Sequence, residues 1–280
     1  MQKLLVTGAA SGIGKCTAEL MGHDHELILC DRSEQQLNEF SRYLNHKGIK
    51  NETIVCDVSI QSAVENAITS ATSNNPIDKV FHAAGVSTSS VENASQLYDI
   101  NLKGTAYFIN AMAPHVSAGT SMLCVASQAS YFAEMMITPE IQKVLSTPLD
   151  DNFIKRLEAA DETKASLEPG AAYGLSKRGV RYLVEAVAFE WGKKDARINT
   201  LSPGIIETPM SLAEAEKYPQ MITIKDLTPL QRWGQPIEVA KVAEFILSAD
   251  ASFMTGADIL LDGGSTPHYI DAVRTQVAAE

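Results

Sequence analysis

The stretch "LLVTGAASGIG", residues 4–14, joins a compact apolar strand to a glycine-rich turn and the start of a helix. Gly8, Gly12 and Gly14 let the backbone turn tightly and approach a pyrophosphate, and the helix N-terminus offers free N–H groups. The spacing is Gly-x-x-x-Gly-x-Gly, whereas the standard dinucleotide motif is Gly-x-Gly-x-x-Gly. An ordinary turn is the alternative, but the position in a first βα unit favours nucleotide binding.

Short apolar runs alternate with longer helical patterns along the rest of the chain. The runs lie at 3–7, 26–30, 52–56, 79–83, 121–127, 197–202 and 258–262, and the helical patterns at 13–22, 33–47, 60–73, 94–115, 172–192 and 236–249. Strands that are buried on both faces read as continuous apolar runs, and this alternation is typical of a parallel sheet. We therefore predict an α/β fold, a doubly wound parallel sheet of about seven strands in a single domain over 1–280.

Two stretches interrupt this alternation, and segments of this kind are commonly lids or binding loops. Residues 205–235 are irregular and rich in proline. Residues 130–171 contain "TPEIQKVLS" (138–146) and "DDNFIKRLEAADE" (150–162), each with apolar residues at helical spacing behind a possible cap, Thr138 or Asp150. We predict a helical insertion over 130–171 near the active site and a C-terminal extension over 265–280.

Bulk composition excludes several classes of protein. The net charge of −11 and an isoelectric point near 5.0 argue against nucleic-acid binding. Four cysteines without a Cys-x-x-Cys pair indicate reduced, buried thiols, and six scattered histidines indicate no metal site. The apolar run near the start of the chain is too short for the apolar region of a signal sequence. No other apolar run reaches membrane-spanning length. We expect a cytoplasmic protein with no membrane partner.

Asp31 ends the second predicted strand, where an acidic residue accepts hydrogen bonds from an adenosine ribose. Its carboxylate would repel a 2′-phosphate and so favours NAD over NADP. Arg32 and Lys15 count the other way, because either can approach a phosphate. The alternative is a loop aspartate near a helix start, but Ser33 and Gln36 already supply a capping-box pattern, which leaves Asp31 free for the ribose.

Several motifs fall in the order found in one known family. These are "TGAASGIG" (7–14), "HAAG" (82–85), Asn101 in "YDINLKG", Ser127, "YGLSK" (173–177) and "SPGIIETP" (202–209). From about residue 3 to the "LLDGG" at 260–264, the chain resembles the short-chain dehydrogenase/reductase family. The resemblance implies a Rossmann-type fold, a nicotinamide cofactor and a catalytic tetrad of Asn101, Ser127, Tyr173 and Lys177.

The chemistry of the tetrad can be argued from its residues. Tyr173 and Lys177 lie four positions apart and share one helix face. A phenol ordinarily has a pKa of about 10, and we expect a nearby lysine ammonium and the nicotinamide charge to lower it. Tyr173 would then be the general base in oxidation and the general acid in reduction. The alternative is a half-buried tyrosine at an ordinary helix start.

The resemblance assigns the remaining roles. Ser127 would donate a hydrogen bond to the substrate oxygen, Lys177 would also hold the nicotinamide ribose, and Asn101 would position a proton-relay water. The expected cofactor-binding set is Gly8, Ser11, Gly12, Ile13, Gly14, Asp31, Arg32, Asp57, Val58, Ala83, Ala84, Gly85, Tyr173, Lys177, Pro203, Gly204, Ile206 and Thr208.

Some of these assignments have alternatives. Asp57 and Val58 are assigned to the adenine, although Asp57 would equally serve as a cap on the following helix. Thr208 and the backbone at Ile206 are assigned to the nicotinamide carboxamide. "HAAG" departs from the commoner Asn-Asn-Ala-Gly, so Ala83 can contribute only its backbone, and we interpret His82 as a packed strand residue.

The leading hypothesis is an NAD(H)-dependent oxidoreductase that interconverts a secondary alcohol and a ketone, with an apolar alicyclic or steroid-like substrate. No charged substrate clamp is recognisable in 130–171 or 205–235. The alternatives are a non-catalytic NAD-sensing protein and an NAD-dependent epimerase or dehydratase, which the short segment after Gly264 disfavours. The family resemblance implies a homodimer or homotetramer. An insertion before the Tyr-Lys helix is similar to that of bacterial hydroxysteroid dehydrogenases, and would overhang the active-site mouth and alter helix pairing.

Overall fold

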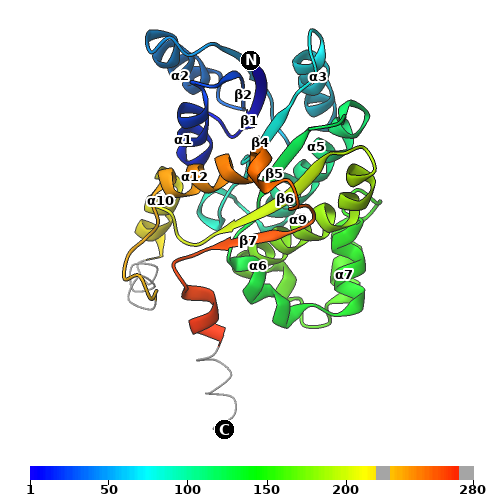
Figure 1. Ribbon diagram of the computed structural model, residues 1–280. Coiled ribbons are helices and arrows are strands. Elements are labelled where there is room, and N and C mark those ends of the chain that lie inside the picture. The colour runs from blue at the N-terminus through cyan, green and yellow to red at the C-terminus, as the bar shows by residue number, and fades with distance from the viewer. Residues whose placement is uncertain (219–227, 271–280) are drawn as a thin grey trace.

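The structure is a computed structural model that describes residues 1–218 and 228–270 (Figure 1). Its strands are β1 (Gln2–Thr7), β2 (His25–Asp31), β3 (Asn51–Val55), β4 (Lys79–His82), β5 (Ser121–Val125), β6 (Arg197–Pro203) and β7 (Asp258–Leu261). They form one sheet in the order β3-β2-β1-β4-β5-β6-β7, and every neighbouring pair is parallel. The predicted Rossmann-type fold is confirmed, and each predicted apolar run overlaps one of these strands.

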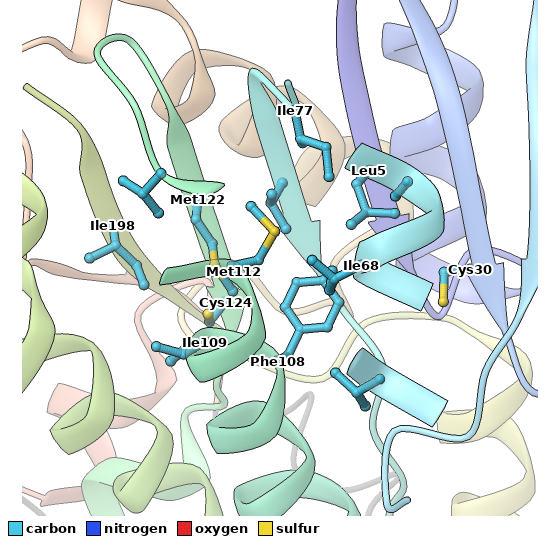
Figure 2. Close-up of a cluster of buried hydrophobic side chains, with 14 of the residues drawn as sticks. Leu5, Cys30, Ile68, Ile77, Phe108, Ile109, Met112, Met122, Cys124 and Ile198 are labelled. Atoms are coloured by element: carbon cyan, nitrogen blue, oxygen red, sulfur yellow. The ribbon is translucent and has the colours of Figure 1, made fainter. Parts of the chain in front are cut away.

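Helices cover both faces of the sheet. They include α1 (Gly12–Met21), α2 (Glu34–His46), α3 (Gln61–Thr72), α4 (Ala94–Leu97), α5 (Gly104–Met112), α9 (Pro169–Gly192) and α12 (Pro236–Leu247). The apolar faces of α3, α5 and α9 pack on one side of the sheet, and Figure 2 shows Ile68, Phe108 and Met112 there. The faces of α1, α2 and α12 pack on the other side. Burial on both faces explains why the strands read as unbroken apolar runs.

The order in which strands are added to the sheet switches sides between β1 and β4. The strands β1, β2 and β3 extend to one side, and β4 to β7 extend to the other. In an open parallel sheet, a crevice forms outside the carboxyl ends of the strands at this switch point, and ligands bind there. Among the described residues, no helix is both long and apolar enough to cross a membrane.

Residues 130–171 contain several short helices, green in Figure 1. These are the end of α6 (Ala129–Phe132), η4 (Ala133–Met136), α7 (Pro139–Ser146), α8 (Phe153–Ala160), η5 (Ala165–Leu167) and the start of α9. A third apolar cluster joins Leu145, Phe153 and Leu157 to Tyr98 and Leu175 of the main body. The Tyr98 hydroxyl also donates to the Ser166 carbonyl at 2.8 Å. The stretch therefore packs on α4 and α9, and its influence on substrate and oligomer stays a prediction.

One of its two predicted caps is wrong. Thr138 caps α7 as expected, accepting a hydrogen bond from the Ile141 N–H at 3.2 Å. Asp150 caps nothing, because α8 begins at Phe153, after Asn152 in the left-handed region at φ 58°. The Asp150 carboxylate instead pairs with Arg156 at 3.2 Å.

The predicted irregular stretch 205–235 contains α10 (Pro209–Lys217), and its residues 219–227 lie outside the described residues. A capping box between Thr208 and Ser211 starts this helix, and Pro209 occupies its first turn. The C-terminal extension predicted over 265–280 is helical at 265–270 and otherwise lies outside the described residues. All four cysteines are free, and all but the half-buried Cys16 are buried.

Truncation of Leu157 tests whether the insertion folds as part of the main body. The side chain is fully buried in the third apolar cluster. We expect Leu157→Ala to lower the free energy of unfolding by about 2–5 kcal/mol, because lost burial and a cavity add. Urea denaturation measures the change, with the exposed Glu158→Ala on the same helix as the control. Equal stability of the two variants would contradict the packing described here.

Candidate active site

The glycine-rich turn at the end of β1 has no room for a side chain at Gly8 or at Gly14. Gly8 and Gly12 have φ values of +64° and +53°, in the left-handed region that favours glycine. A Cβ at Gly8 would lie 2.9 Å from the Ala83 carbonyl oxygen, and one at Gly14 would lie 2.1 Å from the Gly8 carbonyl oxygen. The turn, the start of α1 and the loop after β4 are therefore in backbone contact.

The N-terminus of α1 has the features of an anion site. Its N-cap, Ser11, makes no side-chain capping hydrogen bond, and the first turn, which includes Ile13, carries no acidic residue. The first N–H groups of the helix are therefore left available to an anion, which the helix dipole also favours. This arrangement, beside glycines whose missing Cβ atoms allow close approach, fits the pyrophosphate of a dinucleotide.

Asp31 lies at the end of β2, beside the glycine turn, but its carboxylate is not free as expected. One oxygen accepts from the Ala10 N–H and the other from the Ser33 N–H, both at 3.1 Å. Each oxygen has a second lone pair, so a ribose hydroxyl can still donate to it. Arg32 is exposed, and the Lys15 ammonium lies 5.2 Å from the centre of the Phe40 ring. The two bonds fix the carboxylate at the rim of the site.

Asp57 and Val58 follow β3. The Asp57 carboxylate accepts hydrogen bonds from the Ser59 N–H at 2.9 Å and the Ser59 hydroxyl at 2.7 Å. It does not cap the following helix, because α3 begins after Ile60. Val58 is buried, and its Cγ2 would lie 3.1 Å from a Cβ at Gly104. Their contact with an adenine stays a prediction.

His82, at the end of β4, joins three elements through hydrogen bonds. Its Nδ1 lies 2.9 Å from the Thr7 hydroxyl and its Nε2 lies 3.2 Å from the Thr105 hydroxyl. Burial, and secondarily the Lys177 charge, lower the pKa of His82 to about 3, so the ring is neutral. The Thr105 hydroxyl donates to the Asn101 carbonyl at 2.7 Å. His82 is thus a packed strand residue, as interpreted, and this link to Asn101 was not visible in the sequence.

Asn101 lies in η2 (Tyr98–Lys103), a π-helical turn between α4 and α5. Its side chain donates to the Val86 carbonyl at 3.0 Å and accepts from the Val86 N–H at 2.9 Å. A Cβ at Gly85 would lie 3.0 Å from the Asn101 side-chain oxygen and 3.3 Å from the Lys177 ammonium nitrogen. The backbone of Ala84 is held by its N–H, which donates to the Thr7 hydroxyl at 3.1 Å. Asn101 and Lys177 therefore flank the loop after β4.

Lys177 and Tyr173 come from the first turns of α9. The buried Lys177 ammonium donates to the Val125 carbonyl at 3.0 Å, two residues before Ser127. Burial lowers the pKa of Lys177 to about 8. The Ser127 hydroxyl accepts from the Ala129 N–H at 3.2 Å and is hydrogen-bonded to the half-buried Tyr173 phenol. The structure thus brings the predicted tetrad together around one loop and the end of β5.

The lowered pKa expected for Tyr173 is wrong for the protein's own groups. Burial raises the pKa of Tyr173 to about 12, against the lowering effect of the Ser127 hydrogen bond, and the Glu214 charge raises it further. Burial destabilises the charged phenolate by more than the hydrogen bond from Ser127 stabilises it. Tyr173 is therefore protonated at neutral pH, as a proton donor must be.

The segment after β6 faces the glycine turn. The Gly204 N–H donates to the Leu261 carbonyl at 2.9 Å, following Pro203, the last residue of β6. The Ile206 carbonyl accepts from the Ser211 hydroxyl at 2.5 Å. The Thr208 methyl carbon lies 3.5 Å from the position of a Cβ at Gly12. The predicted cofactor residues on both sides of the switch point are thus adjacent. No cluster of three or more metal-ligating side chains is present among the described residues.

Comparisons with known proteins agree with this geometry. Residues 2–138 match the family model described as short chain dehydrogenase, and residues 159–266 match the one described as enoyl-(acyl carrier protein) reductase. The chain is 32% identical over 268 residues to a short-chain dehydrogenase/reductase of Alternaria brassicicola, covering 94% of this chain and 96% of the relative. It is 30% identical over 276 residues to a cyclohexanol dehydrogenase of Acinetobacter sp., covering 94% of both chains.

A solved structure has the same architecture. The 3-alpha-hydroxysteroid dehydrogenase from Pseudomonas sp., complexed with NADH, is similar with a TM-score of 0.76 and 25% identity, over 98% of each chain. The fold, the glycine turn and the two family matches agree, and the chain belongs to the short-chain dehydrogenase/reductase family, whose members are oxidoreductases that bind a nicotinamide cofactor.

Proposed function

We propose that this protein is an NAD(H)-dependent oxidoreductase that interconverts a secondary alcohol and a ketone. One observation carries the proposal: the Tyr173 phenol is hydrogen-bonded to Ser127, while Lys177 of the same helix is held at the Val125 carbonyl beside Gly85. A proton donor, a hydrogen-bond donor for the substrate oxygen and a buried ammonium thus meet at the mouth of the nicotinamide-binding crevice.

Each residue has a role that follows from its contacts. A bound nicotinamide supplies or accepts the hydride. In reduction, Tyr173 donates its phenolic proton to the carbonyl oxygen, and in oxidation the phenolate removes the hydroxyl proton. Ser127 accepts from the Ala129 N–H, so its own proton can be donated to the substrate oxygen. Lys177 uses one ammonium proton on Val125, which leaves the others for the nicotinamide ribose.

The cofactor preference follows from Asp31. Its carboxylate is fixed by the Ala10 and Ser33 N–H groups at the rim of the glycine turn. A negative charge held there accepts hydrogen bonds from ribose hydroxyls and repels a 2′-phosphate. We propose NAD as the cofactor.

The substrate is proposed from likeness and from the site's surroundings. Two similar proteins, the cyclohexanol dehydrogenase and the hydroxysteroid dehydrogenase, are named for alicyclic alcohols. The apolar insertion packed on α4 and α9 is consistent with an alicyclic ring. The cytoplasmic location and the homodimer or homotetramer stay predictions.

Replacement of the phenol tests the proposed acid/base. We expect Tyr173→Phe to lower turnover by about 10²–10⁴-fold, the usual worth of a positioned proton-transfer group. Binding of NADH, followed by fluorescence titration, should survive. Tyr182→Phe, on the same helix, is the matched control and should keep wild-type turnover. Near-wild-type turnover in Tyr173→Phe would refute the assignment, and a wild-type protein that binds NADH without reducing any ketone would support the sensor alternative.

Removal of the Asp31 charge tests the cofactor preference. The wild-type protein should have a higher kcat/KM with NAD than with NADP. We expect Asp31→Asn, whose amide oxygen can still accept a backbone hydrogen bond, to narrow that preference by about tenfold or more, since like-charge contacts cost several kcal/mol. Steady-state kinetics with both cofactors measure it, with the exposed Glu34→Gln as the control. A wild-type preference for NADP would mean that Arg32 or Lys15 dominates.

The two directions of the reaction should respond differently to pH. Because burial raises the pKa of Tyr173 to about 12, the phenol is in the form required for reduction throughout the neutral range. Between about pH 6 and pH 7.5, below the pKa of about 8 at which Lys177 loses its charge, kcat/KM should stay level for ketone reduction and should rise with pH for alcohol oxidation, which requires the phenolate. Initial rates from NADH absorbance give both profiles. An oxidation profile that is flat in the wild-type protein would contradict this role of Tyr173.

A further inference from the structure

Glu214 lies on α10, the helix that crosses from the glycine turn to the loop after β4. The N-cap of this helix, Thr208, is the residue whose methyl faces Gly12. The helix then packs against η1 (Thr88–Ser90), a short turn three residues beyond Gly85. From the sequence, 205–235 carried no recognisable charged clamp, but the folded helix brings one carboxylate to the site.

The position of that carboxylate is fixed by a long-range contact. The Thr88 hydroxyl donates to one Glu214 carboxylate oxygen at 2.6 Å, across 126 positions of sequence. The Glu214 side chain is half-buried, and its charge raises the pKa of the Tyr173 phenol. The turn η1, which holds Glu214 through Thr88, also contacts α9, the helix of Tyr173, so a substrate seated at Tyr173 lies close to the carboxylate.

No basic side chain neutralises this charge in the part of the chain that the structure describes. None of the ion pairs within 1–218 and 228–270 includes Glu214, and its carboxylate accepts a hydrogen bond from the neutral Thr88 hydroxyl. An unpaired carboxylate beside a reaction centre favours a cation, because a charge-assisted hydrogen bond is roughly twice as strong as a neutral one. The net charge of −11 also favours approach of a cation.

We propose that Glu214 is a specificity-determining residue, and that the preferred substrate is an alicyclic ketone or alcohol that also carries a cationic group, such as an ammonium. This inference rests on the proposed alcohol and ketone chemistry. The competing explanation is that Glu214 has only a structural role, in which its hydrogen bond with Thr88 holds α10 against η1. The two explanations separate in Glu214→Gln, because the amide oxygen keeps the hydrogen bond from Thr88 and only the charge is lost.

Two ketones of the same shape isolate the charge. The 1,1-dimethyl-4-oxopiperidinium ion is permanently cationic, and 4,4-dimethylcyclohexanone is its neutral counterpart. We expect the wild-type protein to have a higher kcat/KM for the cation, and Glu214→Gln to lower the cation-to-neutral ratio by about tenfold or more, through KM. Any effect of the mutation on Tyr173 acts on both ketones and cancels in the ratio. Glu216→Gln, exposed on the same helix, is the matched control.

A binding measurement makes the test independent of turnover. In the presence of oxidised NAD, which cannot reduce a ketone, the cationic ketone should raise the thermal unfolding temperature of the wild-type protein and of Glu216→Gln more than the neutral ketone does, and this difference should vanish in Glu214→Gln. Equal ratios and equal shifts in the wild-type protein and Glu214→Gln would overturn the role of Glu214. Charge-dependent binding without reduction of either ketone would support Glu214 and refute the proposed reaction, so the two failures are distinguishable.

Discussion

The site depends on one steric constraint, which is that no side chain fits between the carboxyl ends of β1 and β4. A Cβ at Gly8 would meet the Ala83 carbonyl at 2.9 Å, and one at Gly14 would meet the Gly8 carbonyl at 2.1 Å. Backbone contact at the switch point lets α1 start directly beside the crevice with its first N–H groups facing an incoming anion. It also brings the loop of Gly85 within reach of Asn101 and Lys177.

Burial then sets the chemistry of the two ionisable groups. Removal from water favours the neutral form of both, so it raises the pKa of Tyr173 to about 12 and lowers that of Lys177 to about 8. The first effect keeps a proton on the phenol. The second means that Lys177 begins to lose its positive charge only slightly above neutral pH. The Lys177 ammonium is held by its hydrogen bond to the Val125 carbonyl, and the Ser127 hydroxyl is hydrogen-bonded to the Tyr173 phenol. The ring of His82 is neutral and adds no competing charge.

The alternation of apolar runs and helical patterns predicted the sheet, whereas several local details and the electrostatics of the site were not predicted. The apolar runs gave every strand of the sheet, because burial on both faces leaves a continuous signal. The π-helical turn at Asn101 was missed, because one extra residue in a helix barely disturbs a 3.6-residue period. The helix α10 was also missed, since Leu212 is exposed and its apolar pattern is weak. Thr208 and Ser211 with Pro209 were the available signal.

The sequence by itself determined the features that depend on covalent spacing. A strand that runs into a glycine turn, and a tyrosine and a lysine four positions apart on one helix, are local properties of the chain. Only the tertiary structure decided the electrostatics of the site. The direction of the Tyr173 pKa shift and the contact of Glu214 with Thr88 depend on burial and on through-space approach of residues far apart in sequence, and no local pattern encodes either.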